Sequence, residues 1–213
     1  AAPADRFAPA PAGLDPVRAA SLPVATTVIT ALRDKARLRP GERLLVRGAT
    51  GGVGVGGVQL GRAYGARVNG LARAELLDLV RELGAEQALD YRTTTPGDLD
   101  RFDVVLDTVG TDLPAYRRLL APGGRMVTVS FDLDHPLCSL GYIAGSTLYG
   151  PRRVRFFSGN PRRDLFEELT RLVEAGRLRP QVDRIFPLSD VAGAHRALET
   201  GGVRGKIVVD VTA

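Results

Sequence analysis

The sequence predicts an α/β fold in which a parallel sheet carries helices on both faces. Short runs rich in Val, Leu and Ile alternate with segments of helical periodicity from residue 43 to residue 157. A cluster of glycines at residues 48–54 separates the first run from the helix that follows it. Because such alternating elements form parallel sheets through right-handed crossovers, we expect a doubly wound sheet of Rossmann type with the strand order 3-2-1-4-5-6.

Each element is predicted from its local pattern. Helices are expected where apolar residues recur at intervals of three and four, and strands where short apolar runs stand between turn residues. The unbroken run Val104-Val-Leu106 suits a strand that is covered on both faces. Gly84 and the segment 121–124 are expected to end the helices before them. The predicted strands are 43–47, 65–71, 87–91, 102–107, 125–130 and 153–157, and the predicted helices are 26–35, 55–64, 74–83 and 113–120.

The end of the chain has a different character. A strongly amphipathic helix is predicted to begin within residues 160–164, and Ser189-Asp190 is expected to cap a helix at 191–199. Two further strands, at 181–187 and 206–211, exceed the six that the doubly wound fold needs, so they are assigned to a partial second module. Before this tail, residues 131–136 are expected to form a loop, and residues 137–148 show no pattern that assigns them.

Composition narrows the classes of function. With 44% hydrophobic and 25% charged residues, the 213-residue chain is typical of a soluble globular protein. A single cysteine and two histidines exclude a zinc site of four cysteines, and we expect no metal. The 29 basic residues, 27 of them arginine, are spread among 24 acidic ones, and aromatic residues are scarce, so we expect no nucleic-acid partner. No apolar run is long enough for a membrane span and no signal peptide is evident, so we expect a cytoplasmic protein without a membrane partner.

The glycine-rich turn is the strongest functional signal. Free N–H groups at the start of a helix carry partial positive charge, and glycine lets a pyrophosphate approach the backbone. In the dinucleotide-binding pattern of three spaced glycines, Ala49, Gly51 and Gly54 occupy the three positions, and Gly52 is an additional glycine. The turn therefore predicts a bound dinucleotide, and the alternative is a glycine-rich turn without a ligand.

Segments along nearly the whole chain resemble the zinc-independent quinone oxidoreductase branch of the medium-chain dehydrogenase/reductase superfamily. The matching segments are Ala20-Ser-Leu-Pro-Val-Ala25, Leu38-Arg-Pro-Gly-Glu42, Gly48-Ala-Thr-Gly-Gly-Val-Gly54, Val58-Gln-Leu60, Leu83-Gly-Ala85, Asp90-Tyr91, Asp107-Thr-Val-Gly110 and Gly205-Lys-Ile-Val208. Alanine at the first glycine position is usual in that branch.

The resemblance implies how the chain is divided. Full-length members begin with a catalytic domain of GroES-like β-barrel type, which is largely missing from this sequence. Residues 1–24 resemble the last part of that domain, residues 25–160 the NADP-binding Rossmann domain, and residues 161–213 the segment that returns to the catalytic domain. Members commonly pair the edge strands of two subunits, so a homodimer through residues 153–157 is expected.

Charge at the end of the second strand predicts the cofactor. An acidic residue there would accept hydrogen bonds from the 2'-hydroxyl of NAD and repel the 2'-phosphate of NADP. Leu71-Ala-Arg73 occupies this place, and no carboxylate precedes Glu75. Arg73 can form a forked contact with a phosphate, so NADPH is the predicted cofactor. The alternative is that Arg73 is one surface arginine among many.

The resemblance assigns further contacts to the cofactor. Tyr91 would lie near the adenosine ribose and its phosphate, or else be a half-buried aromatic at a strand end. Phe156 and Phe157 would lie near the nicotinamide, with one of the two belonging to the core. The complete predicted set is Thr27, Ala49, Thr50, Gly51, Gly52, Val53, Gly54, Arg73, Tyr91, Thr108, Val109, Gly110, Ser130, Phe131, Phe156 and Phe157. No catalytic residue is assigned, although Tyr142, Tyr149 and His135 are conceivable proton donors.

These observations predict an NADPH-dependent, zinc-free oxidoreductase that transfers hydride to a small-molecule quinone or conjugated carbonyl. The cofactor carries the chemistry, and the protein positions it. The alternative is a cofactor-binding module that is catalytically incomplete, such as an enoylreductase-like piece of a larger synthase or a regulatory NADPH binder.

Overall fold

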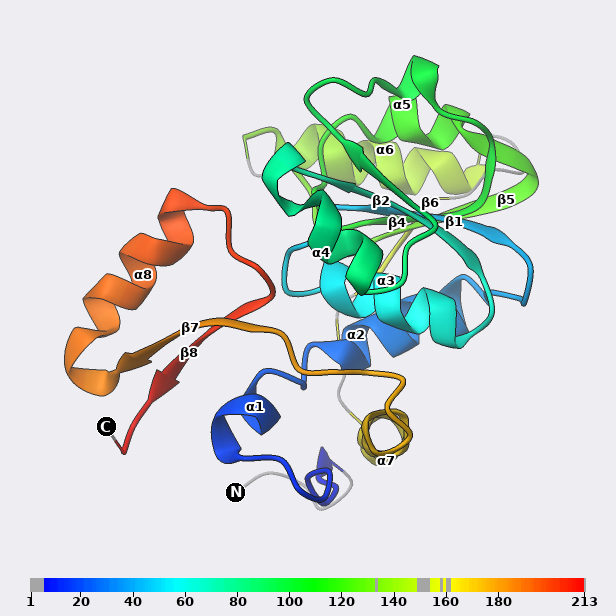
Figure 1. Ribbon diagram of the computed structural model, residues 1–213. Coiled ribbons are helices and arrows are strands. Elements are labelled where there is room, and N and C mark those ends of the chain that lie inside the picture. Colours follow the sequence, from blue (N-terminus) through cyan, green and yellow to red (C-terminus); the bar gives the residue numbers. More distant parts are fainter. Residues whose placement is uncertain (1–5, 133, 149–153, 158, 160–161, 213) are drawn as a thin grey trace.

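The computed structural model describes residues 6–132, 134–148, 154–157, 159 and 162–212. Figure 1 shows a parallel six-stranded sheet between helices and, beside it, a two-stranded sheet with one helix. The strand order of the large sheet is β3-β2-β1-β4-β5-β6, as predicted. Its strands are β1 (Arg43–Arg47), β2 (Arg67–Ala72), β3 (Gln87–Asp90), β4 (Phe102–Asp107), β5 (Leu120–Thr128) and β6 (Val154–Phe156).

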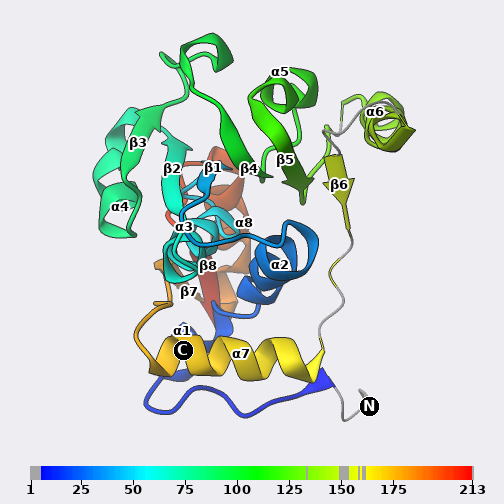
Figure 2. The ribbon, with the colours of Figure 1, turned by 90° about the vertical axis from the view of Figure 1, so that its right-hand side faces the viewer.

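Helices cover both faces of this sheet because its strands are apolar on both sides. Leu44 and Val46 of β1 point into one core, and Leu45, between them, points into the other. The first core is closed by α2 (Ala25–Ile29), α3 (Gly54–Ala63), α4 (Leu77–Glu82) and α7 (Arg163–Glu174). The second is closed by α5 (Leu113–Arg118) and α6 (Pro136–Leu148) (Figure 2).

The remaining elements are short or belong to the second module. Helix α2 continues as the π-helix η2 (Thr30–Lys35), and the 3-10 turn η3 (Ala74–Leu76) precedes α4. In the second module β7 (Val182–Pro187) pairs in parallel with β8 (Lys206–Asp210), and α8 (Val191–Thr200) connects them. The other elements are α1 (Pro16–Ala20), η4 (Pro96–Asp98) and η5 (Leu188–Asp190).

Two parts of the prediction need correction. Strand β5 begins at Leu120, five residues before the predicted start, because residues 121–124 form an irregularity inside the strand rather than ending a helix. It also ends at Thr128, so Ser130 follows the strand. Residues 136–148, most of which the sequence left unassigned, form α6. Residue 153, the first of the predicted sixth strand, lies outside the described residues.

Within the described residues, no helix is long and apolar enough to cross a bilayer.

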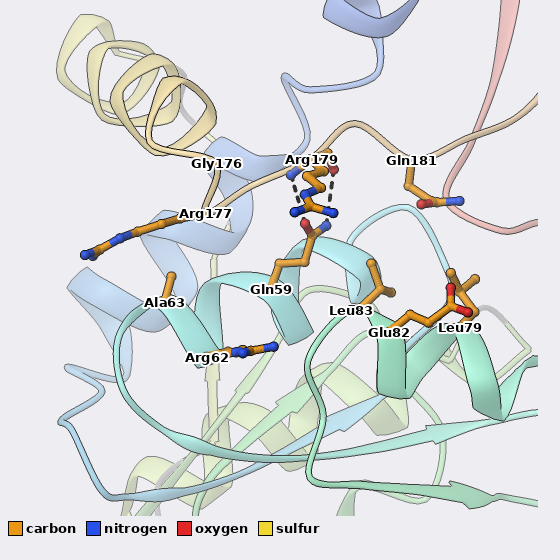
Figure 3. Close-up of a pocket in the computed structure, with 10 residues that line it drawn as sticks. All are labelled: Gln59, Arg62, Ala63, Leu79, Glu82, Leu83, Gly176, Arg177, Arg179 and Gln181. Carbon is orange, nitrogen blue, oxygen red and sulfur yellow. Dashed lines mark hydrogen bonds between the residues drawn. The ribbon is translucent and has the colours of Figure 1, made fainter.

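The side chain of Gln59 bonds α3 to the segment that leads into β7. This residue of α3 is buried; its Nε2 donates to the carbonyl of Arg179 at 3.2 Å, and its Oε1 accepts from the amide of Arg179 at 2.8 Å (Figure 3). The same close-up shows the residues that line a cavity between α3, α4 and residues 176–181. The volume of this cavity is about 570 Å³. None of the predicted cofactor residues lines this cavity.

Gln59→Leu is expected to lower the free energy of unfolding by about 1–2 kcal/mol, because it removes the two part-buried hydrogen bonds to the backbone of Arg179. Urea unfolding measures the change. Arg177→Ala, at an exposed residue that lines the same cavity, is the matched control, with an expected change within about 0.5 kcal/mol. If the two substitutions changed the free energy of unfolding equally, the hydrogen bonds between Gln59 and Arg179 would not stabilise the fold.

Candidate cofactor-binding site

The glycine turn lies at the carboxyl end of β1 and leads directly into α3. Gly48 has φ +69°, and a Cβ on it would lie 2.5 Å from Thr108 Oγ1. A Cβ on Gly54 would lie 2.0 Å from the carbonyl oxygen of Gly48. The turn therefore folds back on the first residue of the helix, and a side chain at either position would collide with it.

The amides of the turn divide into bonded and free groups. Gly51 donates to the carbonyl of Gly48 at 3.1 Å, and Val55 donates to that of Gly51 at 3.0 Å. In the part of the chain that the structure describes, the amides of Gly52 and Val53 have no acceptor. Ala49 is fully buried and donates to the carbonyl of Leu71, so its methyl group belongs to the core. The turn can therefore offer a phosphate free N–H groups, those of Gly52 and Val53 among them, at a helix start.

Lys206 lies over this turn, and sequence reasoning missed it. A Cβ on Gly52 would lie 3.1 Å from Lys206 Nζ and 2.9 Å from its Cε. The preceding Gly205 donates from its amide to the carbonyl of Thr50 at 2.8 Å. Strand β8 thus brings an ammonium group from about 150 residues away in the sequence to the mouth of α3. The sequence did contain a signal for this residue: the segment Gly205-Lys-Ile-Val208 is one of those that resemble the family. The resemblance assigned no role to its lysine.

Arg73 and Tyr91 lie together at the ends of β2 and β3. Arg73 Nε donates to the Tyr91 hydroxyl at 3.3 Å. Its guanidinium also lies close to Gly201 and Gly202, on which a Cβ would be 3.2 and 3.3 Å away. Within the described residues no carboxylate forms an ion pair with Arg73, whereas its neighbour Arg92 lies 4.0 Å from Glu75. Arg73 is therefore a cation available to a ligand.

The turns after β4 and β5 approach each other closely. Gly110 has φ +91°, and a Cβ on it would lie 2.7 Å from the backbone of Phe131. The rings of Phe131 and Phe156 meet edge to face with centroids 5.8 Å apart. The predicted residues Thr108, Val109, Gly110, Ser130, Phe131 and Phe156 thus lie along one edge of the sheet.

Asp107, the last residue of β4, is fully buried behind these turns and faces Arg47. Burial raises the pKa of the Asp107 carboxyl, and the charge of Arg47 and hydrogen bonds from Thr128 and two backbone amides act in the opposite direction.

Thr27 lies on α2, and Phe157 directly follows β6. A Cβ on Gly159 would lie 3.6 Å from Thr27 Oγ1. Phe157 packs against the first core and lies under the ammonium of Lys35 at 5.9 Å, whereas Phe156 is 37% exposed. The core member of the phenylalanine pair is therefore Phe157, while Phe156 can meet a ligand.

The structure assigns no catalytic group. His135 and Tyr142 lie on or next to α6, and His135 is exposed with Asp132 at 3.4 Å. Tyr149, the other conceivable donor, lies outside the described residues. Among the described residues, no group of three or more His, Cys, Asp or Glu side chains is arranged to hold a metal ion.

Comparison with known proteins gives consistent matches. A family described as zinc-binding dehydrogenase matches residues 83–209. The mitochondrial NAD(P)H oxidoreductase RTN4IP1 of Mus musculus is 32% identical over 94% of this chain and 57% of its own length. The chloroplastic NADPH-dependent alkenal/one oxidoreductase of Arabidopsis thaliana is 34% identical over 93% of this chain and 48% of its own. The chain therefore spans about half the length of these curated relatives.

A larger protein and a solved structure extend the comparison. The pikromycin polyketide synthase component PikAII of Streptomyces venezuelae is 34% identical over 93% of this chain, which corresponds to 6% of that protein. The structure of the quinone oxidoreductase from Coxiella burnetii superposes with a TM-score of 0.82 at 31% identity. It covers 93% of this chain and 62% of the other.

Proposed function

Because the chain belongs to the zinc-binding dehydrogenase family of the medium-chain dehydrogenase/reductase superfamily, we propose that it holds NADPH for a zinc-independent reductase of quinones or conjugated carbonyls. The observation that carries this proposal is that three positive groups from distant segments lie at the same edge of the sheet. They are the free amides at the start of α3, the guanidinium of Arg73 after β2, and the ammonium of Lys206 in β8.

Each of these positive groups would bind a particular phosphate of NADPH. The amides of Gly52 and Val53, with Lys206 above them, would bind the pyrophosphate that all nicotinamide dinucleotides share. Arg73, oriented by Tyr91, would bind the 2'-phosphate that distinguishes NADPH from NADH. In the proposed site, the glycine turn and Lys206 bind any nicotinamide dinucleotide, and Arg73 selects NADPH over NADH.

The far end of the site would receive the ribose and nicotinamide. The turn at Thr108, Val109 and Gly110, with Ser130, Phe131 and Phe156, lies along the same edge of the sheet as the glycine turn. When bound, NADPH supplies hydride, and these residues orient its ring and exclude water. Thr27, on α2, and Phe157, which packs against the first core, would support this end of the site.

Further proposals follow from the family. The assignment of residues 25–160 to the cofactor domain, and of 1–24 and 161–213 to a catalytic domain, is proposed by analogy with full-length members. Strand β6 lies at the edge of the sheet, where it would pair with its copy in a homodimer. The cytoplasmic location remains a prediction, since two relatives are named as organellar proteins.

A catalytically incomplete module is the second candidate. The match to 6% of a polyketide synthase component favours it, because there the corresponding segment is part of a much larger chain. Both candidates predict NADPH binding. They differ in whether the protein oxidises NADPH when a quinone or an enone is added.

Titration of the chain with NADPH and NADH, followed by nucleotide fluorescence, tests the proposal. Saturable binding with preference for NADPH is expected. Absence of binding to both nucleotides would reject both candidate functions, because each requires the dinucleotide site.

Lys206→Met is expected to weaken NADPH and NADH equally, by about 10- to 100-fold, because both nucleotides contain the pyrophosphate and hydrogen bonds to charged groups contribute about 1.5–3 kcal/mol. The matched control is Arg177→Met, which removes one positive charge at an exposed residue of the cavity that no predicted cofactor residue lines, and it should leave both affinities unchanged. The same titration measures both variants. Equal affinities for the wild type and Lys206→Met would remove Lys206 from the site.

A further inference from the structure

A buried ion pair joins the ends of two neighbouring strands beside the candidate site. Arg47 and Asp107 are the last residues of β1 and β4 and face each other in register. Arg47 Nη1 lies 2.7 Å from Asp107 Oδ1, and the two side chains are 7% and 0% exposed. Well-packed apolar residues often stabilise a core as much as a buried ion pair does. Stability alone therefore does not explain why charges occupy these positions.

The carboxylate of Asp107 holds the turns that follow β4 and β5. Its Oδ2 accepts from the amide of Gly110 at 3.0 Å and lies 2.9 Å from Thr128 Oγ1. Its Oδ1 also accepts from the amide of Val109 at 3.4 Å. Thr128 Oγ1 in turn lies 2.5 Å from the carbonyl oxygen of Ser130. One carboxylate thus bonds directly to the turn after β4 and, through Thr128, to the turn after β5.

Arg47 holds the same region from the side of β1. Its Nη1 donates to the carbonyl of Thr111 at 2.7 Å, and its guanidinium carbon lies 3.6 Å from the ring centroid of Tyr116. The hydroxyl of Thr108 donates to the backbone carbonyl of Arg47 at 2.7 Å. These contacts connect the glycine turn with the turn after β4, so a shift of one would displace the other.

We propose that the Arg47–Asp107 pair is a positioning device, which fixes the turns after β4 and β5 in the arrangement that binds the nicotinamide end of the cofactor. This inference rests on the proposed function. The adenosine end, at Arg73 and Tyr91, lies at the ends of β2 and β3 and contacts neither member of the pair. Loss of the pair should therefore affect the two halves of the cofactor differently.

The test compares affinity for NADPH with affinity for 2',5'-ADP, which represents the adenosine half. In Asp107→Asn the affinity for NADPH is expected to fall about tenfold, as for the loss of one or two hydrogen bonds, while that for 2',5'-ADP stays within about twofold. The double variant Arg47→Met/Asp107→Leu leaves no unpaired buried charge. Because the buried amide of Gly110 and the buried hydroxyl of Thr128 lose their acceptor, we expect it to unfold at a lower temperature than the wild type. It should still show the same selective loss of NADPH affinity.

Asp103→Asn is the control for a purely structural effect. Asp103 lies on the same strand and accepts from the amide of Arg43 at 2.9 Å. Its loss should lower stability without changing the ratio of the two affinities. An unchanged ratio in Asp107→Asn and in the double variant would overturn the inference. A wild type that binds neither ligand would instead overturn the proposed function, and the inference with it.

Discussion

Gly54→Ala is expected to abolish the binding of NADPH. The new Cβ would lie 2.0 Å from the carbonyl oxygen of Gly48 and 2.8 Å from the carbonyl carbons of Gly48 and Ala49. These atoms all belong to the backbone, so no side-chain rotation relieves the contact and the turn must open. We expect at least about a 100-fold loss of NADPH affinity, as for two charge-assisted hydrogen bonds. The free energy of unfolding should fall by about 1–3 kcal/mol, and calorimetric titration and urea unfolding measure the two effects.

Gly145→Ala is the matched control for this substitution. Gly145 lies inside α6, and a Cβ there would meet no atom within 4 Å. Alanine is favoured over glycine in a helix interior by about 1 kcal/mol, so stability should be unchanged or higher and NADPH affinity unchanged. If Gly54→Ala bound NADPH as tightly as Gly145→Ala, the glycine turn would not be the binding site.

The large sheet could be predicted because its signals are local and agree with one another. The run at 102–107 became β4 with the predicted bounds, and strands alternating with helices gave the predicted order. The contact between Arg73 and Tyr91 follows from this order, because the carboxyl ends of neighbouring parallel strands meet at one edge. The two residues were assigned by separate arguments, one from charge and one from resemblance.

The features that were missed depend on contacts between distant residues. Residues 121–124 contain proline and two glycines, which usually end a helix, yet pairing with β4 continues the strand around them. Lys206 belongs to a strand of the second module, and the hydrogen bond from Gly205 to Thr50 holds this strand at the glycine turn. Asp107 was one residue of a matching segment, and its role in joining the two turns depends on Arg47 and Thr128.

Arg73→Ala is expected to weaken NADPH binding by about 10- to 100-fold, the cost of losing a charge-assisted contact with the 2'-phosphate. Affinity for NADH should stay within about twofold, because NADH has no phosphate there. Arg73 has no carboxylate partner among the described residues, so its removal leaves no unpaired acidic group. Parallel titrations with the two nucleotides separate this loss from the equal weakening expected for Lys206→Met.

Arg92→Ala is the control for the loss of positive charge at this edge of the sheet. Arg92 follows Tyr91, is exposed, and lies 4.0 Å from Glu75 rather than facing the proposed phosphate position. Arg92→Ala changes the net charge by the same amount as Arg73→Ala. A general effect of charge would therefore lower the affinity for NADPH equally in the two variants. That outcome, or a loss of NADH affinity equal to that of NADPH in Arg73→Ala, would show that Arg73 does not select the 2'-phosphate. A selective loss in Arg73→Ala would identify the ligand and the side chain that distinguishes it, because the two nucleotides differ only at that phosphate.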